Sequence, residues 1–316
     1  MKRFSLSLIL VSGLLIAIPP SASAETRTFP CGSGGGTYSV SMPEGIAFKA
    51  YRCSGSLTID NSVKIIEDSA FADQFLTSII IPNSVTSIGD KAFIDTTIAS
   101  VTIGNSVASI GDNAFAWAPL TSVTIPNSVT SIGRAAFAET NLTSVTLGNS
   151  LTSIGPYAFS NTLIASVVIP NSMISIGEQA FDQTPLTSVT IPNSVTSIGV
   201  RAFANIPTLT SISLPINLKF LGINVFEENR SLVKIEYCGK LTGVPITPVC
   251  PSKAAADAKT AADKIIQDAK LEAARILAAA KAAAAKKTTI ICIKGKLTKK
   301  VIGVKPKCPT GYKVKK

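Results

Sequence analysis

The residues best suited to covalent chemistry in this chain are its six cysteines. They fall into three pairs along the sequence: Cys31 and Cys53, Cys238 and Cys250, and Cys292 and Cys308. This segregation favours three sequential disulfides over the other pairings that six cysteines allow. A zinc site fits poorly, because no pair has CxxC spacing and the chain has no histidine. We therefore expect the protein to reside in an oxidising compartment, with each pair closing a short loop.

The absence of histidine also bears on catalysis. It removes the usual general base, the Ser-His and Cys-His nucleophile pairs and the commonest metal ligand. Charged groups that could replace it, such as Arg134, Glu139, Glu178 and Arg201, are scattered along the sequence. The glycine run at 32–36 lacks the Gly-Lys-Ser/Thr that completes a phosphate-binding loop. We predict no catalytic residue, no metal site and no cofactor.

The positive charge is concentrated at one end of the chain. Residues 286–316 contain eleven lysines and no acid, which equals the whole formal charge of +11. Such a segment suits an anionic cell wall or lipid surface, and its alternative role is that of a solubilising tail. We do not expect nucleic acid as a partner, because this segment has only Tyr312 for stacking. The lysines predicted to contact an anionic surface are Lys294, Lys296, Lys299, Lys300, Lys305, Lys307, Lys313, Lys315 and Lys316.

These groups have to be positioned by a repeat of 22 residues. Phe71, Phe93, Phe115, Phe137, Phe159, Phe181 and Phe203 are each 22 residues apart, and Phe226 follows after 23. A fixed period in this range indicates a solenoid that grows one coil at a time.

One copy, residues 120–137 (LTSVTIPNSVTSIGRAAF), shows how a coil should fold. The alternation around Val123 predicts a short strand, and Pro126-Asn127 breaks it. Val129, Ile132 and Phe137 are expected to point inward, with Gly133 allowing a second turn. We expect nine such strand positions, from Leu57 to Tyr237, to stack as one parallel sheet at about 4.8 Å per coil.

The LTSVTIPNSVTSIGxxAF core resembles the repeat of the BspA-like leucine-rich repeat proteins of bacterial and protist surfaces. The resemblance covers Leu57 to Tyr237 and recurs eight times. It departs from that family in its 22-residue length, where about 23 is usual, and several copies lack the cysteine after phenylalanine. The resemblance implies a surface-exposed binding or adhesion protein without catalytic residues.

The repeat offers a ligand two kinds of surface. The outward strand positions are serine and threonine, which suit either a solvated face or a broad polar contact with protein or glycan. The variable positions follow each phenylalanine and should line a row of turns. The ligand-contact candidates are Trp117, Phe75, Glu139 and Asp182. Trp117 ranks first because aromatic residues dominate interface energetics, although it could equally pack on a neighbouring coil.

The segments outside the repeats predict export and attachment. Residues 1–24 have the charged start, short apolar run and Ala-Ser-Ala ending of a signal peptide, with cleavage expected before Glu25. Residues 25–53 should form an N-terminal cap on the solenoid at 54–237, and 238–252 a C-terminal cap. Residues 253–287 are rich in alanine and predict a helical spacer or, alternatively, a weak oligomerisation helix. Residues 288–316 predict a small basic hairpin.

The sequence thus predicts a mainly β leucine-rich repeat solenoid, followed by an α-helix and a basic hairpin. The expected function is that of a secreted or cell-surface binding or adhesion scaffold, held to the envelope by its basic tail. The alternative is a structural surface or matrix protein whose solenoids associate with one another.

Overall fold

The computed structural model describes residues 25–32, 35–237, 269, 271–272, 275, 288–294, 297–303, 310 and 313–314. The predicted signal peptide, the predicted C-terminal cap and nearly all of the predicted spacer helix lie outside these residues. Residues 269, 271–272 and 275 are helical. Within the described part of the chain, no helix is both long enough and apolar enough to cross a membrane.

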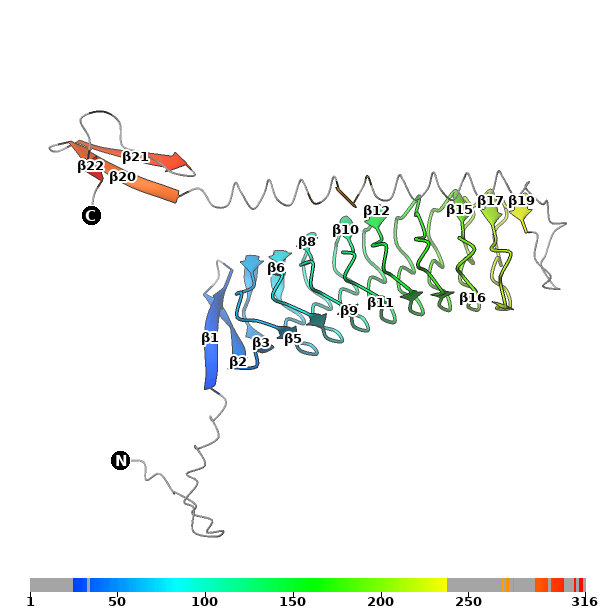
Figure 1. Ribbon diagram of the computed structural model, residues 1–316, viewed down its shortest axis with the longest axis horizontal. Helices are drawn as coiled ribbons and strands as arrows, with labels where there is room; N and C mark the ends of the chain where they lie inside the picture. Colours follow the sequence, from blue (N-terminus) through cyan, green and yellow to red (C-terminus); the bar gives the residue numbers. More distant parts are fainter. Residues whose placement is uncertain are drawn as a thin grey trace, which may run out of the picture.

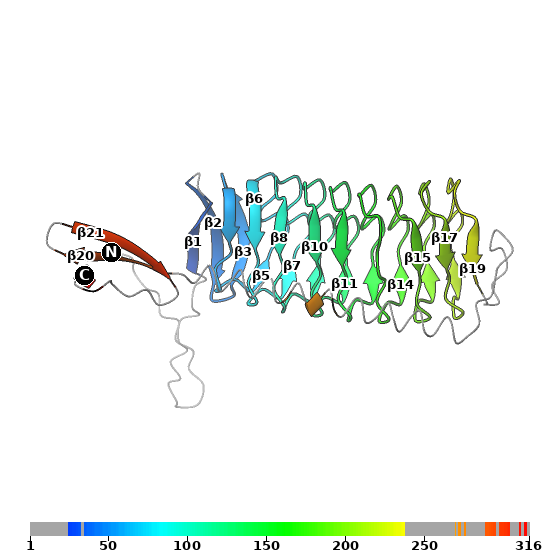
Figure 2. The same cartoon turned by 90° about the horizontal axis from the view of Figure 1, so that it is seen from above.

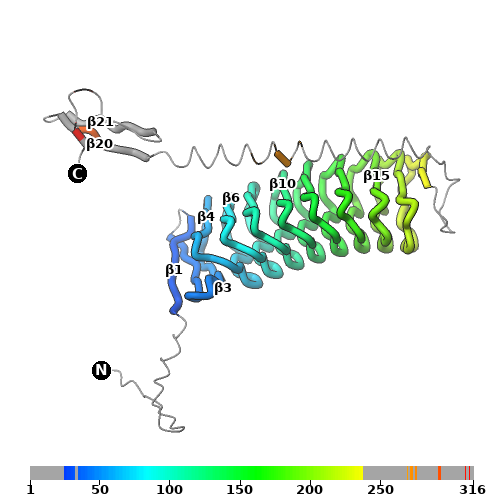
Figure 3. The backbone as a smooth tube through the Cα atoms, in the orientation of Figure 1, coloured from blue at the N-terminus to red at the C-terminus, as the bar shows by residue number. Residues whose placement is uncertain are grey.

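The repeats form a β-solenoid of about nine turns, in which 22-residue coils lie side by side in sequence order (Figures 1 and 3). Most coils contribute a short strand to each of two sides of the solenoid, and the strands of successive coils pair in parallel (Figure 2). The coil that contains Val167 contributes a strand to one side alone. The prediction of a leucine-rich repeat solenoid is therefore confirmed.

One side of the solenoid is a continuous sheet of eleven strands. From β3 onward its strands pair in parallel, and each two-residue strand from β7 to β16 is a Ser-Ile pair aligned with the pair 22 residues away. In spatial order the strands are β1 (Glu25–Cys31), β2 (Gly36–Met42), β3 (Ile46–Tyr51), β5 (Ile65–Ile66), β7 (Ser87–Ile88), β9 (Ser109–Ile110), β11 (Ser131–Ile132), β13 (Ser153–Ile154), β14 (Ser175–Ile176), β16 (Ser197–Ile198) and β18 (Phe220–Leu221).

The other side carries eight of the nine strands that the sequence predicted, with none around Val167, and these eight do not form one sheet. They form three separate parallel groups: β4 (Ser54–Thr58), β6 (Phe75–Ile80) and β8 (Ser100–Thr102); β10 (Ser122–Thr124) and β12 (Ser144–Thr146); and β15 (Ser188–Thr190), β17 (Ser211–Ser213) and β19 (Lys234–Glu236). The prediction of a single nine-stranded sheet was wrong. The continuous ladder runs instead through the Ser-Ile pairs, for which the sequence predicted an inward isoleucine but no strand.

The core is made of the side chains at the positions that repeat from coil to coil. Leu120, Val123, Ile125, Val129 and Ile132 are all buried. Their counterparts in the two neighbouring coils are buried too, except Val101, which is partly buried. The inward assignment made for this copy is therefore correct at every one of these positions. Because each coil buries the same set, one hydrophobic core runs the length of the solenoid.

A stack of aromatic rings forms the centre of this core. The rings of Phe71, Phe93, Phe115, Phe137, Phe159, Phe181 and Phe203 follow one another with centroid separations of 5.0 to 5.5 Å. Tyr38 of β2 extends the stack at 5.4 Å from Phe71. Its hydroxyl oxygen accepts a hydrogen bond from the Asp60 backbone N–H at 2.9 Å. Burial raises the pKa of the Tyr38 phenol, so the ring stays neutral within the stack.

Threonine hydroxyls close the turn after the stacked ring. Thr96, Thr140, Thr162 and Thr184 are buried, and each donates a hydrogen bond to the carbonyl of the phenylalanine three residues earlier at 2.8 to 2.9 Å. Each hydroxyl satisfies a carbonyl group that the turn would otherwise leave without a partner.

The glycine that follows each Ser-Ile pair is required for close packing. A Cβ added to Gly133 would lie 2.5 Å from the Asp112 Oδ1 atom and 2.6 Å from the Gly111 carbonyl carbon. The same obstruction by the preceding coil recurs at Gly89, Gly111, Gly155, Gly177 and Gly199. None of these glycines has a positive φ. Our reason for Gly133 was therefore wrong: it allows two coils to approach one another, and its conformational freedom is not used.

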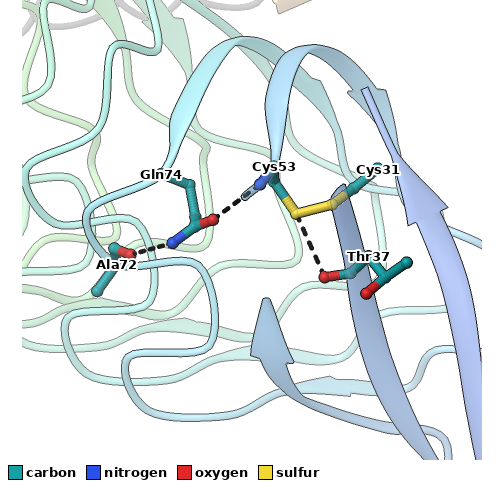
Figure 4. The surroundings of a disulfide bond; sticks show 5 residues. All are labelled: Cys31, Thr37, Cys53, Ala72 and Gln74. Atoms are coloured by element: carbon teal, nitrogen blue, oxygen red, sulfur yellow. Dashed lines mark hydrogen bonds between the residues drawn. A yellow bond between two sulfur atoms is a disulfide. The ribbon is translucent and has the colours of Figure 1, made fainter. Parts of the chain in front are cut away.

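Three antiparallel strands, β1, β2 and β3, adjoin the first coil, and β3 then pairs in parallel with β5. Cys31 and Cys53 form the expected disulfide (Figure 4). The Cys53 backbone N–H donates to Gln74 Oε1 at 2.9 Å, and Gln74 Nε2 donates to the Ala72 carbonyl at 3.0 Å. The disulfide thus connects β1 to the turn of the first coil.

Near the other end of the chain, β20 (Thr288–Lys294) pairs antiparallel with both β21 (Leu297–Gly303) and β22 (Lys313–Val314). Cys292 is buried and disulfide-bonded. The remaining cysteines, Cys238, Cys250 and Cys308, lie outside the described residues, so the other two predicted pairings stay predictions.

We predict that Gly133→Ala lowers the free energy of unfolding by about 1–3 kcal/mol, because the new methyl group overpacks the interface between two coils. Urea denaturation followed by circular dichroism measures the change. Gly35→Ala is the matched control: Gly35 has open space around its Cβ position but a φ of +73°. The close-packing explanation fails if Gly133→Ala costs no more than this control.

Candidate functional site

The turns that carry the variable residues share an unusual backbone. Each coil places two residues in the left-handed region, at φ values between 49° and 61°, and none of them is glycine. The second of these two positions, which we call the turn column, is occupied by Asp73, Asp95, Trp117, Glu139, Asn161, Gln183, Asn205 and Glu228. Asparagine and aspartate tolerate this conformation best among non-glycine residues.

Trp117 is the exception in the turn column. It is the only tryptophan of the chain and has a φ of 61°, which bulky side chains rarely adopt. Its neighbours Ala116 and Ala118 are buried, whereas Trp117 itself is 55% exposed. Packing on a neighbouring coil, the alternative expected from the sequence, leaves more than half of this side chain in contact with solvent. The fold would accept a smaller polar residue here, so its own requirements do not explain the tryptophan.

Two carboxylates flank Trp117 along the turn column. Asp95 precedes it by one coil and Glu139 follows it by one coil, and both are exposed. Their spacing is set by backbone hydrogen bonds between coils: the Asp95 N–H donates to the Ala116 carbonyl at 3.0 Å, and the Trp117 N–H to the Ala138 carbonyl at 3.1 Å. Asn161 Nδ2 donates to the Glu139 carboxylate. The sequence interpretation missed Asp95, although its position 22 residues before Trp117 would have identified it.

Phe75 lies two residues after the turn column, in a coil closer to the N terminus, and is 71% exposed. Leu163 occupies the corresponding position four coils later and is also exposed. The structure therefore brings Phe75, Trp117 and Glu139 to one edge of the solenoid, along the turns that follow the stacked phenylalanines.

Asp182 does not belong to this edge. It is only 2% exposed, and its carboxylate accepts hydrogen bonds from Asn205 Nδ2 at 2.8 Å and from the side-chain amides of Gln179 and Gln183. A buried carboxylate whose oxygens are engaged in this way is not available to a surface ligand. The proposal of Asp182 as a contact residue is therefore corrected: it joins two adjacent coils.

Arg134, Glu178 and Arg201 each have a partner in a neighbouring coil. The Arg134 guanidinium lies 4.7 Å from the centre of the Tyr157 ring, and the Tyr157 hydroxyl donates to Glu178 Oε1 at 3.3 Å. Arg201 pairs with Glu227 at 2.9 Å. Among the described residues, no group of three or more cysteine, aspartate or glutamate side chains is placed to hold a metal ion.

The lysines proposed to contact an anionic surface are only partly described. Lys294 lies in β20, Lys299 and Lys300 lie in β21, and Lys313 lies in β22. In the pairing of β20 with β21, Lys299 stands opposite Cys292 and Lys300 opposite Ile291. The other lysines of the set, Lys296, Lys305, Lys307, Lys315 and Lys316, lie outside the described residues.

Comparison with known proteins identifies the repeat. A family model described as a BspA type leucine rich repeat region matches residues 45–165 and 152–246, which together make up more than half of the chain. No curated protein matches the chain.

Three solved bacterial structures are similar to parts of the chain. The pneumococcal vaccine antigen PcpA is 18% identical, with 66% of this chain and 69% of that chain covered and a TM-score of 0.49. The leucine-rich repeat protein TpLRR of T. pallidum is 22% identical, with coverages of 62% and 86% and a TM-score of 0.44. A leucine rich cell surface protein of Faecalibacterium prausnitzii is 18% identical, with coverages of 69% and 97% and a TM-score of 0.29.

We predict that Ala135→Asn raises the free energy of unfolding by about 0.5–1 kcal/mol, since asparagine adopts left-handed backbone more readily than alanine does. Ala135 has a φ of 50°, and the corresponding residue of the preceding coil is Asn113. The control is Ala108→Asn at an exposed position outside the left-handed columns, which should change little. If the two variants had equal urea midpoints, the left-handed backbone would not discriminate between side chains, and the reason for singling out Trp117 would be lost.

Proposed function

The chain belongs to the BspA-type leucine-rich repeat family, and from this premise we propose that it is an exported binding or adhesion scaffold of the cell surface. It binds a protein or glycan ligand through the edge of the solenoid that carries Trp117, and it performs no catalysis.

The observation that carries this proposal is that Trp117 is an exposed, bulky side chain on a left-handed backbone, which such residues rarely adopt. The inward-pointing side chains of each coil are buried. The glycine after each Ser-Ile pair allows adjacent coils to pack closely, and the buried threonines stabilise the turns. Trp117 serves neither purpose and is exposed in a conformation that costs a bulky residue roughly 1–2 kcal/mol. A large exposed aromatic side chain that is retained against such a cost suits a contact with a partner.

The charged groups support binding over catalysis. Arg134, Glu178, Arg201 and Glu227 are engaged with partners in different coils, so they do not converge on one reacting atom. General acid–base catalysis requires such groups within hydrogen-bonding reach of one substrate. The repeat is accordingly a scaffold whose chemistry is recognition.

We further propose how the scaffold is presented. A signal peptide at 1–24 directs export, the alanine-rich segment at 253–287 forms a helical spacer, and the basic segment at 288–316 forms a hairpin that holds the protein to an anionic envelope. Lysines near a charged surface contribute about 1 kcal/mol each, so several acting together suffice for retention that salt can reverse.

A second candidate function is that of a structural surface or matrix protein formed by self-association. The observation in its favour is the last coil, where Ile216, Phe220, Ile223 and Val233 are all exposed. Apolar side chains gathered at the end of a solenoid suit a contact with another molecule. The segment at 253–287 is a second element through which weak oligomerisation would occur. Concentration-dependent assembly of the purified chain would favour this function over binding of a foreign ligand.

We predict that the exported chain binds a surface protein or glycan saturably and that Trp117→Asn weakens this binding at least tenfold, about 1.4 kcal/mol. The turn column accommodates asparagine at Asn161 and Asn205, so the variant should fold. An array of envelope proteins and glycans, followed by titration of the hits, measures the effect. The control is Ile174→Thr, which removes a similarly exposed apolar side chain beside the Ser-Ile strands, away from this edge, at a position where the neighbouring coils have Thr152 and Thr196. Binding that is unchanged by Trp117→Asn would remove this edge from consideration.

We also predict that removal of residues 288–316 releases the protein from the envelope into the medium. Substitution of Lys299, Lys300, Lys305 and Lys307 by glutamine should release it in part, because each lysine contributes its charge independently. Cell fractionation and immunoblotting at low and high salt measure the distribution. Retention of the truncated protein by the envelope would disprove the anchoring role.

A further inference from the structure

The small sheet of β20, β21 and β22 has two unlike faces (Figure 1). Ile291 of β20 is 45% exposed, whereas its neighbour Cys292 is 0% exposed and disulfide-bonded. Lys313 of β22 stands opposite Ile293 and is exposed as well. Because successive residues of a strand point to opposite faces, Ile291 and Ile293 belong to the exposed face and Cys292 belongs to the other.

The register of the strands gives the composition of the exposed face. Residues that stand directly opposite one another share a face, and Ile291 is paired with Lys300 and Thr289 with Ile302. We call this the isoleucine face, and its apolar and charged members are Ile291, Ile293, Ile302, Lys300 and Lys313. It thus combines three isoleucines with two lysines.

Isoleucine and lysine on one face discriminate between two kinds of anionic surface. Lysines are attracted both to anionic lipids and to an anionic wall polymer, because each presents negative charge. A hydrated polymer offers no apolar environment, so an exposed isoleucine gains nothing from it. At a bilayer surface, apolar side chains enter the boundary between headgroups and acyl chains while lysines remain among the headgroups. The isoleucine face therefore fits a bilayer better than a wall polymer.

We propose that the isoleucine face docks on the surface of an anionic phospholipid bilayer. This inference rests on the anchoring role proposed for the basic segment, and it names the surface that holds the protein. Charge complementarity supports this partner, since residues 286–316 contain eleven lysines and no acid. The isoleucines and the lysines act together, because weak apolar insertion becomes a stable attachment when a basic patch adds its attraction.

The test measures binding of the full chain from Glu25 onward to three defined surfaces. These are vesicles of phosphatidylglycerol with phosphatidylcholine, vesicles of phosphatidylcholine alone, and delipidated cell-wall fragments. Co-sedimentation at about 0.1 M salt, where the Debye length is about 10 Å, gives a partition coefficient for each. We expect strong partitioning to the phosphatidylglycerol vesicles alone.

The first variant, Ile291→Thr with Ile293→Thr, removes apolar surface and leaves the charge unchanged. Threonine is also β-branched and suits a strand, so the sheet should persist. We expect the partition coefficient for phosphatidylglycerol vesicles to fall at least tenfold, about the effect of withdrawing one aliphatic side chain from an apolar environment.

Ile80→Thr is the matched control for this variant. Ile80 lies in β6 of the solenoid and is 47% exposed, close to the exposure of Ile291. Its partners in the adjacent coils are Thr58 and Thr102, so threonine fits this position. This variant should bind all three surfaces as the wild type does.

A second variant, Lys300→Gln with Lys313→Gln, keeps the isoleucines and removes two charges. It should weaken binding to phosphatidylglycerol vesicles about thirtyfold, roughly fivefold for each lysine. Titration of free thiols in denaturant checks the fold of both variants, because Cys292 stays disulfide-bonded when the strands form. The single variant Ile291→Thr replaces the double one if the latter releases a thiol.

Three outcomes would overturn the proposal. Binding to wall fragments without binding to vesicles would assign the basic segment to the wall and leave its anchoring role intact. Vesicle binding that is unchanged in the isoleucine variant would show that charge acts alone. Self-association without vesicles that this variant abolishes would assign the isoleucine face to a second copy. Failure of the anchoring role itself is seen separately, as retention of the chain that lacks residues 288–316.

Discussion

The stacking of one phenylalanine ring per coil is the interaction on which the rest of this molecule depends. Rings that repeat at 5.0 to 5.5 Å impose a nearly constant translation between coils. That translation matches the spacing at which parallel strands share hydrogen bonds. One ring at the same place in every coil therefore aligns the Ser-Ile ladder, the glycine contacts and the left-handed turns at once. Tyr38 continues the stack into β2, so the strands at the N-terminal end obey the same spacing.

Such regularity separates positions that the fold requires from those that it leaves open. A glycine such as Gly133 is required because the preceding coil occupies the space of its Cβ atom. A threonine such as Thr140 donates its hydroxyl to the carbonyl of the phenylalanine three residues earlier, which fixes the turn. The turn column is different, since the fold demands only a left-handed backbone and tolerates many side chains there. Side chains that contact a partner can therefore be placed in the turn column without disrupting the solenoid. Trp117 is the least expected residue there, because bulky side chains rarely adopt a left-handed backbone.

The distribution of charge divides the molecule into two parts with different tasks. The solenoid is mildly acidic and carries the candidate contact edge, whereas the C-terminal segment is strongly basic. Opposite charges within one chain attract each other as well as external surfaces. The recognition and the anchoring that we propose are therefore assigned to parts of the chain with opposite charge.

The sequence by itself determined the period, the family, the inward set and the pairing of Cys31 with Cys53, because each depends on local pattern or on spacing along the chain. Only the tertiary structure decided which strands form the continuous sheet. Hydrogen bonds between coils depend on backbone position, and the Ser-Ile pairs stay in one ladder where the strands of the other side divide into three groups. Packing between coils also decided the role of Gly133 and the burial of Asp182, since both are set by residues about 22 positions away in sequence. Trp117 was predicted from its residue type, but its exposure and its left-handed backbone became visible only once the coils were stacked.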